Sequence, residues 1–374
     1  MTSGLQDLQA LQVAQGAKLE PANAALQQGN TQRTVPTTFG HGAVAIAAAQ
    51  TRVAVCDRSH WGRIAVGDGD RLRFLHNQST NSFLNLQAGQ GCETVFVTST
   101  ARTIDLVSAY ARPESVLLLT HPTARSSLIK WMDRFIFFAD KVKLVDETDE
   151  TVTFSLIGPE STGVLEKLSI SVKAISAHHH ETVMFAGSEI LVAVGSGLAL
   201  PGYTLIAPVS VAATLWEAIA TAEVIPLGEA EWEPLRIAQG RPIPGAELTD
   251  DYNPLEAGLW HTITFDKGCY IGQETIARLD TYNGVKQQLW GIRLAHRVEP
   301  GTPLWLADKK VGRITSVAES MVASGEDEII GLAYVRTKAG GEGLQLQVGE
   351  ADSALTATVI GVPFLTRSRQ EPAP

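Results

Sequence analysis

The sequence predicts an α+β protein that ends in a small antiparallel β-barrel. Segments with the 3.6-residue period of an amphipathic helix, such as Ser126–Phe138 and Val209–Ala220, alternate with short segments that indicate strands, such as Thr94–Thr98. From about Val285 to Leu344–Val348, short alternating strands follow one another, separated by turns that contain Gly or Pro. Such regular spacing of short strands is typical of a small barrel.

The length of 374 residues is enough for two or three domains. No internal repeat and no Walker or Rossmann glycine fingerprint is present. We expect an N-terminal helical and loop extension over residues 1–50, a core over residues 51–285 with subdomains at about 51–150 and 151–285, a barrel over residues 286–365 and a disordered tail over residues 366–374.

Composition disfavours several classes of protein. The formal net charge of -10 argues against a nucleic-acid binder that works through bulk charge. The three cysteines, Cys56, Cys92 and Cys269, form no C-x-x-C pair, and their sparse, odd number fits a reducing compartment, which we expect to be the cytoplasm. No apolar run has the length of a membrane span, and the N-terminus lacks a secretory signal, so we expect no membrane partner.

The run His178-His179-His180 is a candidate metal site because imidazole is a common metal ligand. Consecutive residues on a strand or a helix cannot all face one ion, and no Cys or carboxylate stands at ligand spacing. We therefore expect a solvated loop here and no metal.

The stretch Phe265–Leu279 combines the features of a reactive-cysteine site. It reads F-D-K-G-C-Y-I-G-Q-E-T-I-A-R-L, and Gly268 and Gly272 predict a tight turn around Cys269. The run that follows has helical period, so the thiol is expected just before a helix N-terminus, which together with Lys267 would favour the thiolate. The alternative is a buried, inert cysteine, which is the commoner state of a free thiol.

The octapeptide K-G-C-Y-I-G-Q-E at residues 267–274 resembles the signature of the YgfZ-type folate-binding proteins, relatives of the glycine cleavage T-protein (GcvT), an aminomethyltransferase. The T-protein itself usually carries another residue at the position of Cys269. The runs D-R-S-H-W-G, G-Y-T-L, N-P-L-E-A-G-L and V-G-R-I-T-S are similar to segments of the same superfamily, in the same order. The resemblance implies a T-protein-like core of mixed and antiparallel sheets with helices, followed by the barrel.

The resemblance also implies which residues hold the folate. Glu256 stands where a glutamate hydrogen-bonds the pterin amino group, and a carboxylate suits the paired N–H donors of a pterin edge. Asp105 stands where the T-protein has an acid beside the folate nitrogen, although it could be a solvated or turn aspartate. Tyr203 takes the place of a tyrosine that lines the pterin pocket, or is an ordinary core aromatic. Lys267 and Gln273 complete the expected folate contacts; Gln273 could instead orient the thiol or cap the helix.

The implied function is the binding of tetrahydrofolate, or of a one-carbon-substituted folate, in support of iron–sulfur cluster assembly or repair. Iron–sulfur enzymes or assembly proteins would be the partners, with a link to tRNA modification through such enzymes. Cys269 could accept a one-carbon unit, exchange with a cluster ligand or form a transient disulfide.

Two alternatives remain. The first is folate-dependent aminomethyl or methyl transfer like that of the T-protein, with Asp105 and Glu256 as orienting or proton-handling carboxylates. The second is direct tRNA binding through a basic rim of Lys267, Arg278 and Lys286, which the acidic balance of the chain disfavours.

Overall fold

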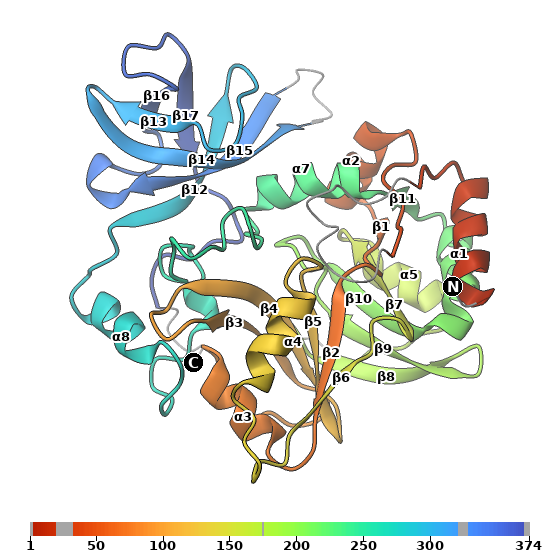
Figure 1. Cartoon of the computed structure of the whole chain (residues 1–374). Helices are drawn as coiled ribbons and strands as arrows, with labels where there is room; N and C mark the ends of the chain where they lie inside the picture. The colour runs from red at the N-terminus through yellow and green to blue at the C-terminus, as the bar shows by residue number, and fades with distance from the viewer. Residues whose placement is uncertain (1–2, 20–32, 174–175, 321–327, 370–374) are drawn as a thin grey trace. The chain divides into compact units, whose positions relative to one another are not determined.

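The computed structural model describes residues 3–19, 33–173, 176–320 and 328–369 of the chain. The chain divides into two compact units, each assembled from three segments. Unit 1 comprises Met1–His76, Phe83–Thr94 and Val107–Trp232, and unit 2 comprises Asn77–Ser82, Val95–Leu106 and Glu233–Pro374. The course of the chain through its helices and strands can be followed in Figure 1.

A six-stranded mixed sheet forms the centre of unit 1, with the strand order β11-β1-β7-β10-β9-β8. Its strands are β1 (Ala54–Asp57), β7 (Thr151–Ile157), β8 (His180–Phe185), β9 (Ser188–Val194), β10 (Gly202–Pro208) and β11 (Ile225–Leu227). The pairing of β1 with β11 is parallel and the other pairings are antiparallel. All four residues of β1 are buried, as expected for a central strand.

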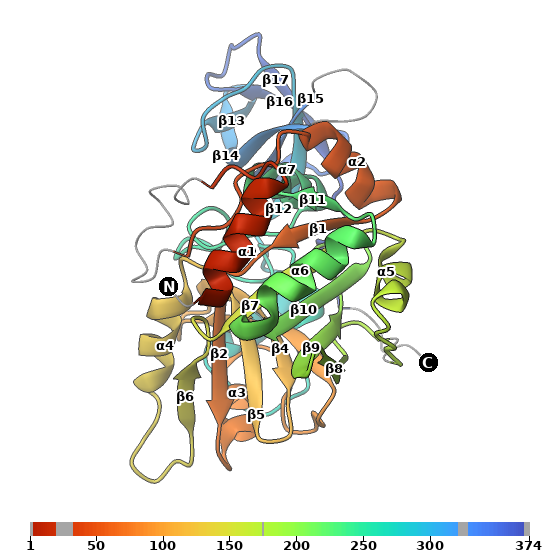
Figure 2. The ribbon, with the colours of Figure 1, turned by 90° about the vertical axis from the view of Figure 1, so that its right-hand side faces the viewer.

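Three helices pack on one face of this sheet and share its apolar cluster: α1 (Ser3–Ala14), α5 (Ser161–Lys167) and α6 (Ala212–Thr221). A further helix, α2 (Gly42–Thr51), contacts β1 and β11. In α6, Leu215, Trp216 and Ile219 are buried, which are the residues that the helical period marks as its apolar face. Figure 2 shows α1 beside α6 in front of β7 and β10, and Leu8 of α1 joins the same apolar cluster.

A five-stranded antiparallel sheet has the order β3-β4-β5-β2-β6, so β6 lies at its edge. The strands are β2 (Gly62–Gly67), β3 (Gly91–Val97), β4 (Thr103–Ala111), β5 (Ser115–Thr120) and β6 (Lys143–Asp146). Two helices occur between these strands in the sequence, α3 (Arg71–Gln78) and α4 (Arg125–Asp133). The helix expected over Ser126–Phe138 ends at Asp133, because the backbone N–H groups of Phe135 and Ile136 close tight turns onto Met132 and Asp133.

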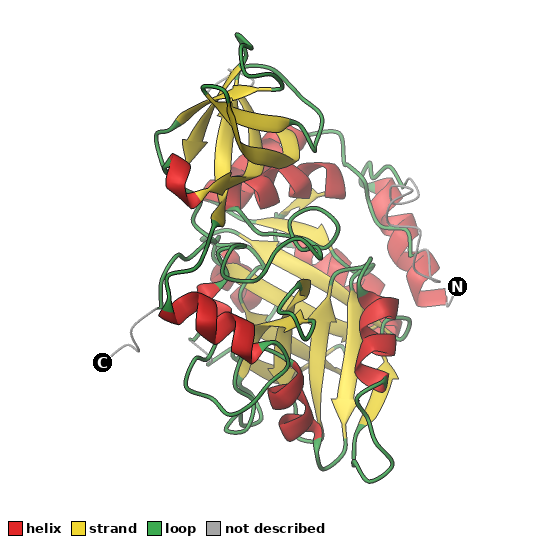
Figure 3. Ribbon diagram, turned by 60° about the vertical axis from the view of Figure 1, so that its left-hand side comes forward, coloured by secondary structure: helices red, strands yellow, loops and turns green. Residues whose placement is uncertain are grey.

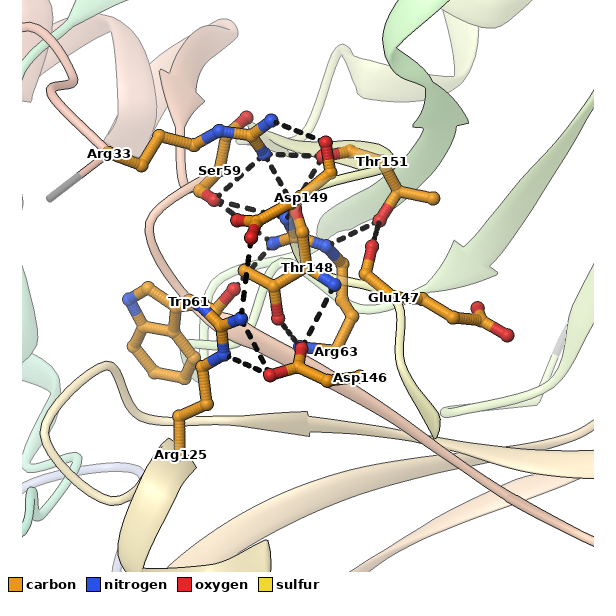
Figure 4. Close-up of polar contacts among 10 residues, drawn as sticks. All are labelled: Arg33, Ser59, Trp61, Arg63, Arg125, Asp146, Glu147, Thr148, Asp149 and Thr151. Carbon is orange, nitrogen blue, oxygen red and sulfur yellow. Dashed lines mark hydrogen bonds and ion pairs between the residues drawn. The ribbon is translucent and has the colours of Figure 1, made fainter. Parts of the chain in front are cut away.

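A buried arginine network holds the segment between β6 and β7 (Figure 4). The Arg63 side chain is fully buried and donates to the carbonyl oxygens of Ser59, Thr148 and Thr151. Arg33 donates to the same three carbonyl groups. Burial, followed by the neighbouring charges of Arg33 and Arg125, lowers the pKa of Arg63 to about 9. Nothing in the spacing of these residues predicts the network, because most acceptors of Arg63 and Arg33 are backbone oxygens.

Unit 2 contains the predicted barrel and two helices, α7 (Glu229–Gln239), which begins in unit 1, and α8 (Gln273–Thr281). The barrel strands are β12 (Gln287–Leu294), β13 (Pro303–Leu306), β14 (Lys309–Ser320), β15 (Glu328–Arg336), β16 (Gln345–Val348) and β17 (Thr356–Ile360). They form a closed barrel (Figure 3). Their order is β12-β15-β14-β13-β16-β17, with antiparallel pairing throughout. The expected α+β class with a C-terminal antiparallel barrel is therefore confirmed.

Of the segment 366–374, expected to be disordered, residues 366–369 are described and make defined contacts, and residues 370–374 lie outside the described part of the chain. The guanidinium of Arg367 lies 3.3 Å from the ring centroid of Trp290, and that of Arg369 lies 4.2 Å from the ring centroid of Phe265. These cation–π contacts attach the segment to the barrel and to the stretch that precedes α8.

Candidate functional site

The turn before α8 depends on Gly272. This residue caps the helix with a φ of 83°, in the left-handed region that glycine adopts at little cost. A Cβ atom here would also lie 2.9 Å from the carbonyl oxygen of Thr98 and 3.1 Å from Cα of Ala101. Gly268, in contrast, does not take a positive φ. Cys269 therefore lies just before a helix N-terminus, as the sequence predicts, and Gly272 is the glycine that the backbone requires.

Lys267 is not an exposed cation. Its side chain is only 9% exposed, and its ammonium group donates to the carbonyl oxygens of Ser79 at 2.7 Å and Asn81 at 2.6 Å. The ammonium also lies 4.5 Å from the ring centroid of Tyr270. The expectation that Lys267 contributes to an exposed basic rim is wrong, because this charge is committed to the segment Asn77–Ser82.

The other large side chains of the stretch also hold the turn in place. Tyr270 and Ile276 are buried in an apolar cluster with Ala101, Leu255 and Ile263, and burial raises the pKa of the Tyr270 hydroxyl. Gln273 donates from Nε2 to the carbonyl oxygen of Lys267 at 3.3 Å, which closes the turn.

Cys269 is a free, exposed cysteine, whereas Cys56 is buried and Cys92 is half-buried. The alternative of a buried, inert Cys269 is therefore wrong. The folded stretch presents the thiol to solvent.

Glu256 lies in a hydrogen-bonded turn that begins at Asn253. The Asn253 side-chain oxygen accepts the backbone N–H groups of Leu255 and Glu256, each at 3.0 Å, and the Asn253 N–H donates to Oε2 of Glu256 at 3.2 Å. Glu256 is 7% exposed. Burial raises the pKa of its carboxyl above the ordinary value, against the lowering effects of the Asn253 N–H, Arg102 and the Gln287 side chain.

A cavity of about 810 Å³ in unit 2 opens onto this carboxylate. Its charged lining residues include two acids, Asp251 and Glu256, and four bases. The bases are Arg102, Lys286, Arg336 and Lys338. In a chain of net charge -10, a cavity with two more bases than acids favours an anionic ligand.

The cavity is assembled from segments that are far apart in the chain. Arg102 donates to the carbonyl oxygen of Asp251 at 2.8 Å, and the N–H of Thr337 donates to the carbonyl oxygen of Lys286 at 2.9 Å. Gln287 pairs with Arg336 where β12 meets β15. Of its four bases, sequence reasoning singled out only Lys286, and it assigned that residue to a different surface. The only available signal was that Lys286 and Arg336 stand at the ends of alternating strands.

The two remaining candidate residues, Asp105 and Tyr203, lie on strands. Asp105, on β4 within the segment Val95–Leu106 of unit 2, is fully buried, so the alternative of a solvated or turn aspartate is wrong. Tyr203, on β10 of unit 1, packs against the apolar cluster of that unit, and its hydroxyl lies 3.1 Å from Oγ1 of Thr162. The structure thus brings Asp105, Glu256, Lys267, Cys269 and Gln273 into unit 2 and leaves Tyr203 in unit 1. Leu255 and Tyr270 belong to one apolar cluster of unit 2.

The histidine run is only partly solvated. His180 begins β8 and is buried, with its ring centroid 5.6 Å from that of Tyr110. Burial, followed by the positive charges of Arg112 and His179, lowers the pKa of His180 to about 4. Within the described segments, no group of three His, Cys, Asp or Glu side chains could hold a metal ion. The same segments contain no helix with the length and apolar character of a membrane span.

The chemistry of the cavity fits a reduced folate. A pterin edge presents N–H donors, for which the buried Glu256 carboxylate is a matched acceptor. The glutamyl end of the cofactor carries carboxylates, and the bases of the cavity are suitable partners for them. Glu256 and the four basic residues of the cavity are therefore the residues that would hold a folate.

Comparison with protein families identifies the class of this protein. The sequence matches the GCVT N-terminal domain over residues 9–267 and the glycine cleavage T-protein C-terminal barrel domain over residues 287–365. The chain therefore belongs to the glycine cleavage T-protein family, within a superfamily of folate-dependent transferases.

Individual relatives cover most of the chain. A chloroplastic protein of Arabidopsis thaliana, provisionally named a transferase, is 42% identical over 334 residues, which are 89% of this chain and 76% of that protein. An aminomethyltransferase of Geobacillus thermodenitrificans is 30% identical over 86% of this chain and 89% of its own length. The crystal structure of the glycine cleavage system aminomethyltransferase T from Bartonella henselae, at 18% identity, covers 98% of this chain and 99% of its own with a TM-score of 0.82, so the fold is shared.

Proposed function

We propose that this protein binds tetrahydrofolate, or a one-carbon-substituted folate, in the cavity of unit 2, and that it supports iron–sulfur cluster assembly or repair through Cys269. The observation that carries the proposal is the combination of a buried carboxylate in a basic cavity and an exposed thiol on a firmly held turn, within one unit. The YgfZ-type signature around Cys269 supports the iron–sulfur role.

Within this function, Glu256 accepts the N–H donors of the pterin, and the basic residues of the cavity bind the glutamyl carboxylates. A bound tetrahydrofolate supplies a carrier for one-carbon units. Lys267 and Gln273 act by holding the turn that presents Cys269, as their hydrogen bonds indicate. For Asp105 and Tyr203, the proposal that they contact the folate rests only on the resemblance of their sequence segments to the T-protein superfamily.

The partners would be iron–sulfur enzymes or assembly proteins, some of them serving tRNA modification. A reducing compartment such as the cytoplasm suits the three free cysteines.

Anaerobic calorimetric titration with tetrahydrofolate tests the ligand and the role of Glu256. Glu256→Gln keeps the size of the side chain and an oxygen for the Asn253 N–H, but it removes the charge. We expect a loss of about 1.5–3 kcal/mol, the range for a hydrogen bond to a charged group, or roughly 10- to 150-fold in the dissociation constant. Glu350→Gln, an exposed position in the same unit, is the matched control.

Equal dissociation constants for the wild type and Glu256→Gln would remove Glu256 from the site. No binding of any reduced folate by the wild type would overturn the proposed ligand.

Complementation of a deletion strain tests the thiol. We expect Cys269→Ala to bind tetrahydrofolate normally and yet fail to restore the activity of iron–sulfur enzymes. Cys92→Ala, which removes a half-buried thiol in unit 1, is the control and should restore it. Full restoration by Cys269→Ala would refute the role of the thiol.

A second candidate function is aminomethyl or methyl transfer to tetrahydrofolate. It is favoured by the buried carboxyl of Asp105 on β4, where burial gives an acid the environment of a proton-handling group. Turnover with an aminomethyl donor, lost in Asp105→Asn and kept in Cys269→Ala, would establish it.

A further inference from the structure

The edge strand β6 and the loop before it expose three large apolar side chains. Phe137 and Phe138 in the loop before β6 are 70% and 108% exposed, and Val145 within β6 is 37% exposed. Two phenylalanines side by side in water, next to an open sheet edge, mark an interaction surface rather than scattered exposure. Figure 2 shows β6 beside β2 at the end of its sheet, with the preceding loop extending past it.

The loop is held firmly in this exposed position. Phe137 and Asp140 exchange two hydrogen bonds, from the Asp140 N–H to the Phe137 carbonyl oxygen and from the Phe137 N–H to the Asp140 carboxylate, each at 2.9 Å. Lys141 and Asp70 exchange a second pair, also at 2.9 Å. The apolar side chains are therefore presented by a defined turn that costs little further ordering on binding.

The register of β6 on β2 fixes which of its backbone groups face outward. The pairs are Ala65 with Val145 and Gly67 with Lys143, and the N–H of Glu147 donates to the carbonyl oxygen of Arg63. Because hydrogen-bonded pairs alternate in an antiparallel ladder, residues 143, 145 and 147 direct their backbone groups toward β2. Leu144 and Asp146 consequently direct theirs to the outer edge, where no strand of the described chain pairs.

We propose that β6 pairs with β6 of a second copy of this chain, antiparallel about a twofold axis at Val145. In an antiparallel ladder, two opposed residues must both direct their backbone groups toward the partner strand or both direct them away. Three registers meet this condition and keep most of β6 paired. They place Leu144 opposite Leu144, Asp146 opposite Asp146, or Leu144 opposite Asp146. The second of these opposes two carboxylates. The third places Val145 against Val145 and Lys143 against Glu147 of the partner, twice by symmetry.

Charge excludes the register centred on Asp146. The register centred on Leu144 sets Lys143 opposite Val145, and the lysine that it brings to Glu147 is Lys141, which lies outside β6 and is hydrogen-bonded to Asp70. The register centred on Val145 instead opposes Val145 to Val145 and the strand residue Lys143 to Glu147, so it is the one we select. Lys143 is exposed, and Glu147, which already binds Arg112 through two hydrogen bonds at 2.8 and 3.0 Å, would receive a second cation. A lysine on an edge strand ordinarily discourages pairing, but in this register it meets an anion rather than another lysine. Because the strand is only four residues long, the contact is smaller than a standard interface, and the dimer is weak and concentration-dependent.

Cysteine cross-linking tests the register directly, in a Cys269→Ser background that removes the exposed native thiol. Opposed residues of a non-hydrogen-bonded antiparallel pair have Cα atoms about 4.5 Å apart, within the range of about 4.4–6.8 Å that a disulfide spans. We expect Val145→Cys to form a disulfide-linked dimer rapidly with diamide. Met184→Cys, a 64% exposed position on β8 at the edge of the other sheet, is the control and should react slowly.

Sedimentation velocity over a concentration series supplies the second measurement. Lys143→Glu should raise the dimer dissociation constant at least about fivefold, since two attractive cross-strand pairs become repulsive. Lys309→Glu, which makes the same charge change on an exposed barrel residue, should leave it unchanged. A monomer at every concentration, or cross-linking of Val145→Cys no faster than that of Met184→Cys, would overturn the proposal and leave the exposed loop to a different partner.

Discussion

The substitution Gly272→Ala tests whether the turn before α8 is held by backbone conformation and close packing, as the structure indicates. Two costs apply. A left-handed conformation costs an L-residue about 1–2 kcal/mol. The new Cβ would also lie 2.9 Å from the Thr98 carbonyl oxygen, which belongs to the backbone and cannot move cheaply, and overpacking of this kind costs about 1–3 kcal/mol. The expected loss is therefore about 2–5 kcal/mol.

Gly245→Ala separates the two costs. Gly245 also belongs to unit 2 and has a φ of 85°, close to that of Gly272, but nothing lies within 4 Å of the position that its new Cβ atom would take. It should therefore lose only the conformational part, about 1–2 kcal/mol. The difference between the two variants measures the contact with Thr98 and its neighbours.

Hydrogen exchange along a urea titration, followed in peptides from α8, reports the stability of this segment. Equal losses for Gly272→Ala and Gly245→Ala would refute the steric part of the reasoning. A loss below about 1 kcal/mol for both would refute the conformational part as well.

Three further predictions concern buried charges. Lys267→Met removes the ammonium that holds the Ser79 and Asn81 carbonyl groups and should cost about 2–5 kcal/mol, measured by hydrogen exchange in residues 77–82. Arg63→Met should destabilise unit 1 by about 3–5 kcal/mol in urea unfolding, because it breaks a buried hydrogen-bond network: the Trp61 carbonyl group loses its Arg63 donor, and the carbonyl groups of Ser59, Thr148 and Thr151 each lose one of two arginine donors. Burial raises the pKa of the Glu256 carboxyl in the folded protein, so protonation of Glu256 increases the free energy of unfolding as the pH falls through that raised pKa. The affinity for folate should decline over the same pH range, because the carboxylate loses its charge. Calorimetry against pH should show this decline in the wild type and not in Glu256→Gln.

Local features of the signature stretch could be predicted because neighbouring residues determine them. The period that begins at Gln273 predicts α8, and Gly272 predicts the sharp turn before it. The alternation after Val285 predicts the barrel in the same way, and β16 and β17 do bury every second residue, whereas β12 and β15 contain runs of consecutive buried residues.

Long-range features could not be predicted. Lys267 looked like a free cation because its acceptors lie 188 and 186 residues away and are backbone oxygens, which leave no mark in the sequence. The bases of the cavity come from separate segments whose proximity depends on the pairing of β12 with β15. His180 looked solvated because a run of histidines gives no alternation from which burial of its last member could be read.

In the signature stretch, the residues that stabilise the fold are different from the residue that carries the thiol. Lys267, Tyr270 and Gln273 each make a contact that holds the turn, so substitutions at these positions confound loss of function with loss of structure. Cys269 is exposed, and an exposed side chain away from such contacts changes stability by only about 0.5 kcal/mol or less when it is replaced. A functional defect in Cys269→Ala, with unfolding unchanged, must therefore come from the chemistry of the thiol. This makes Cys269 the position in the stretch at which a functional assay can be interpreted without correction for folding.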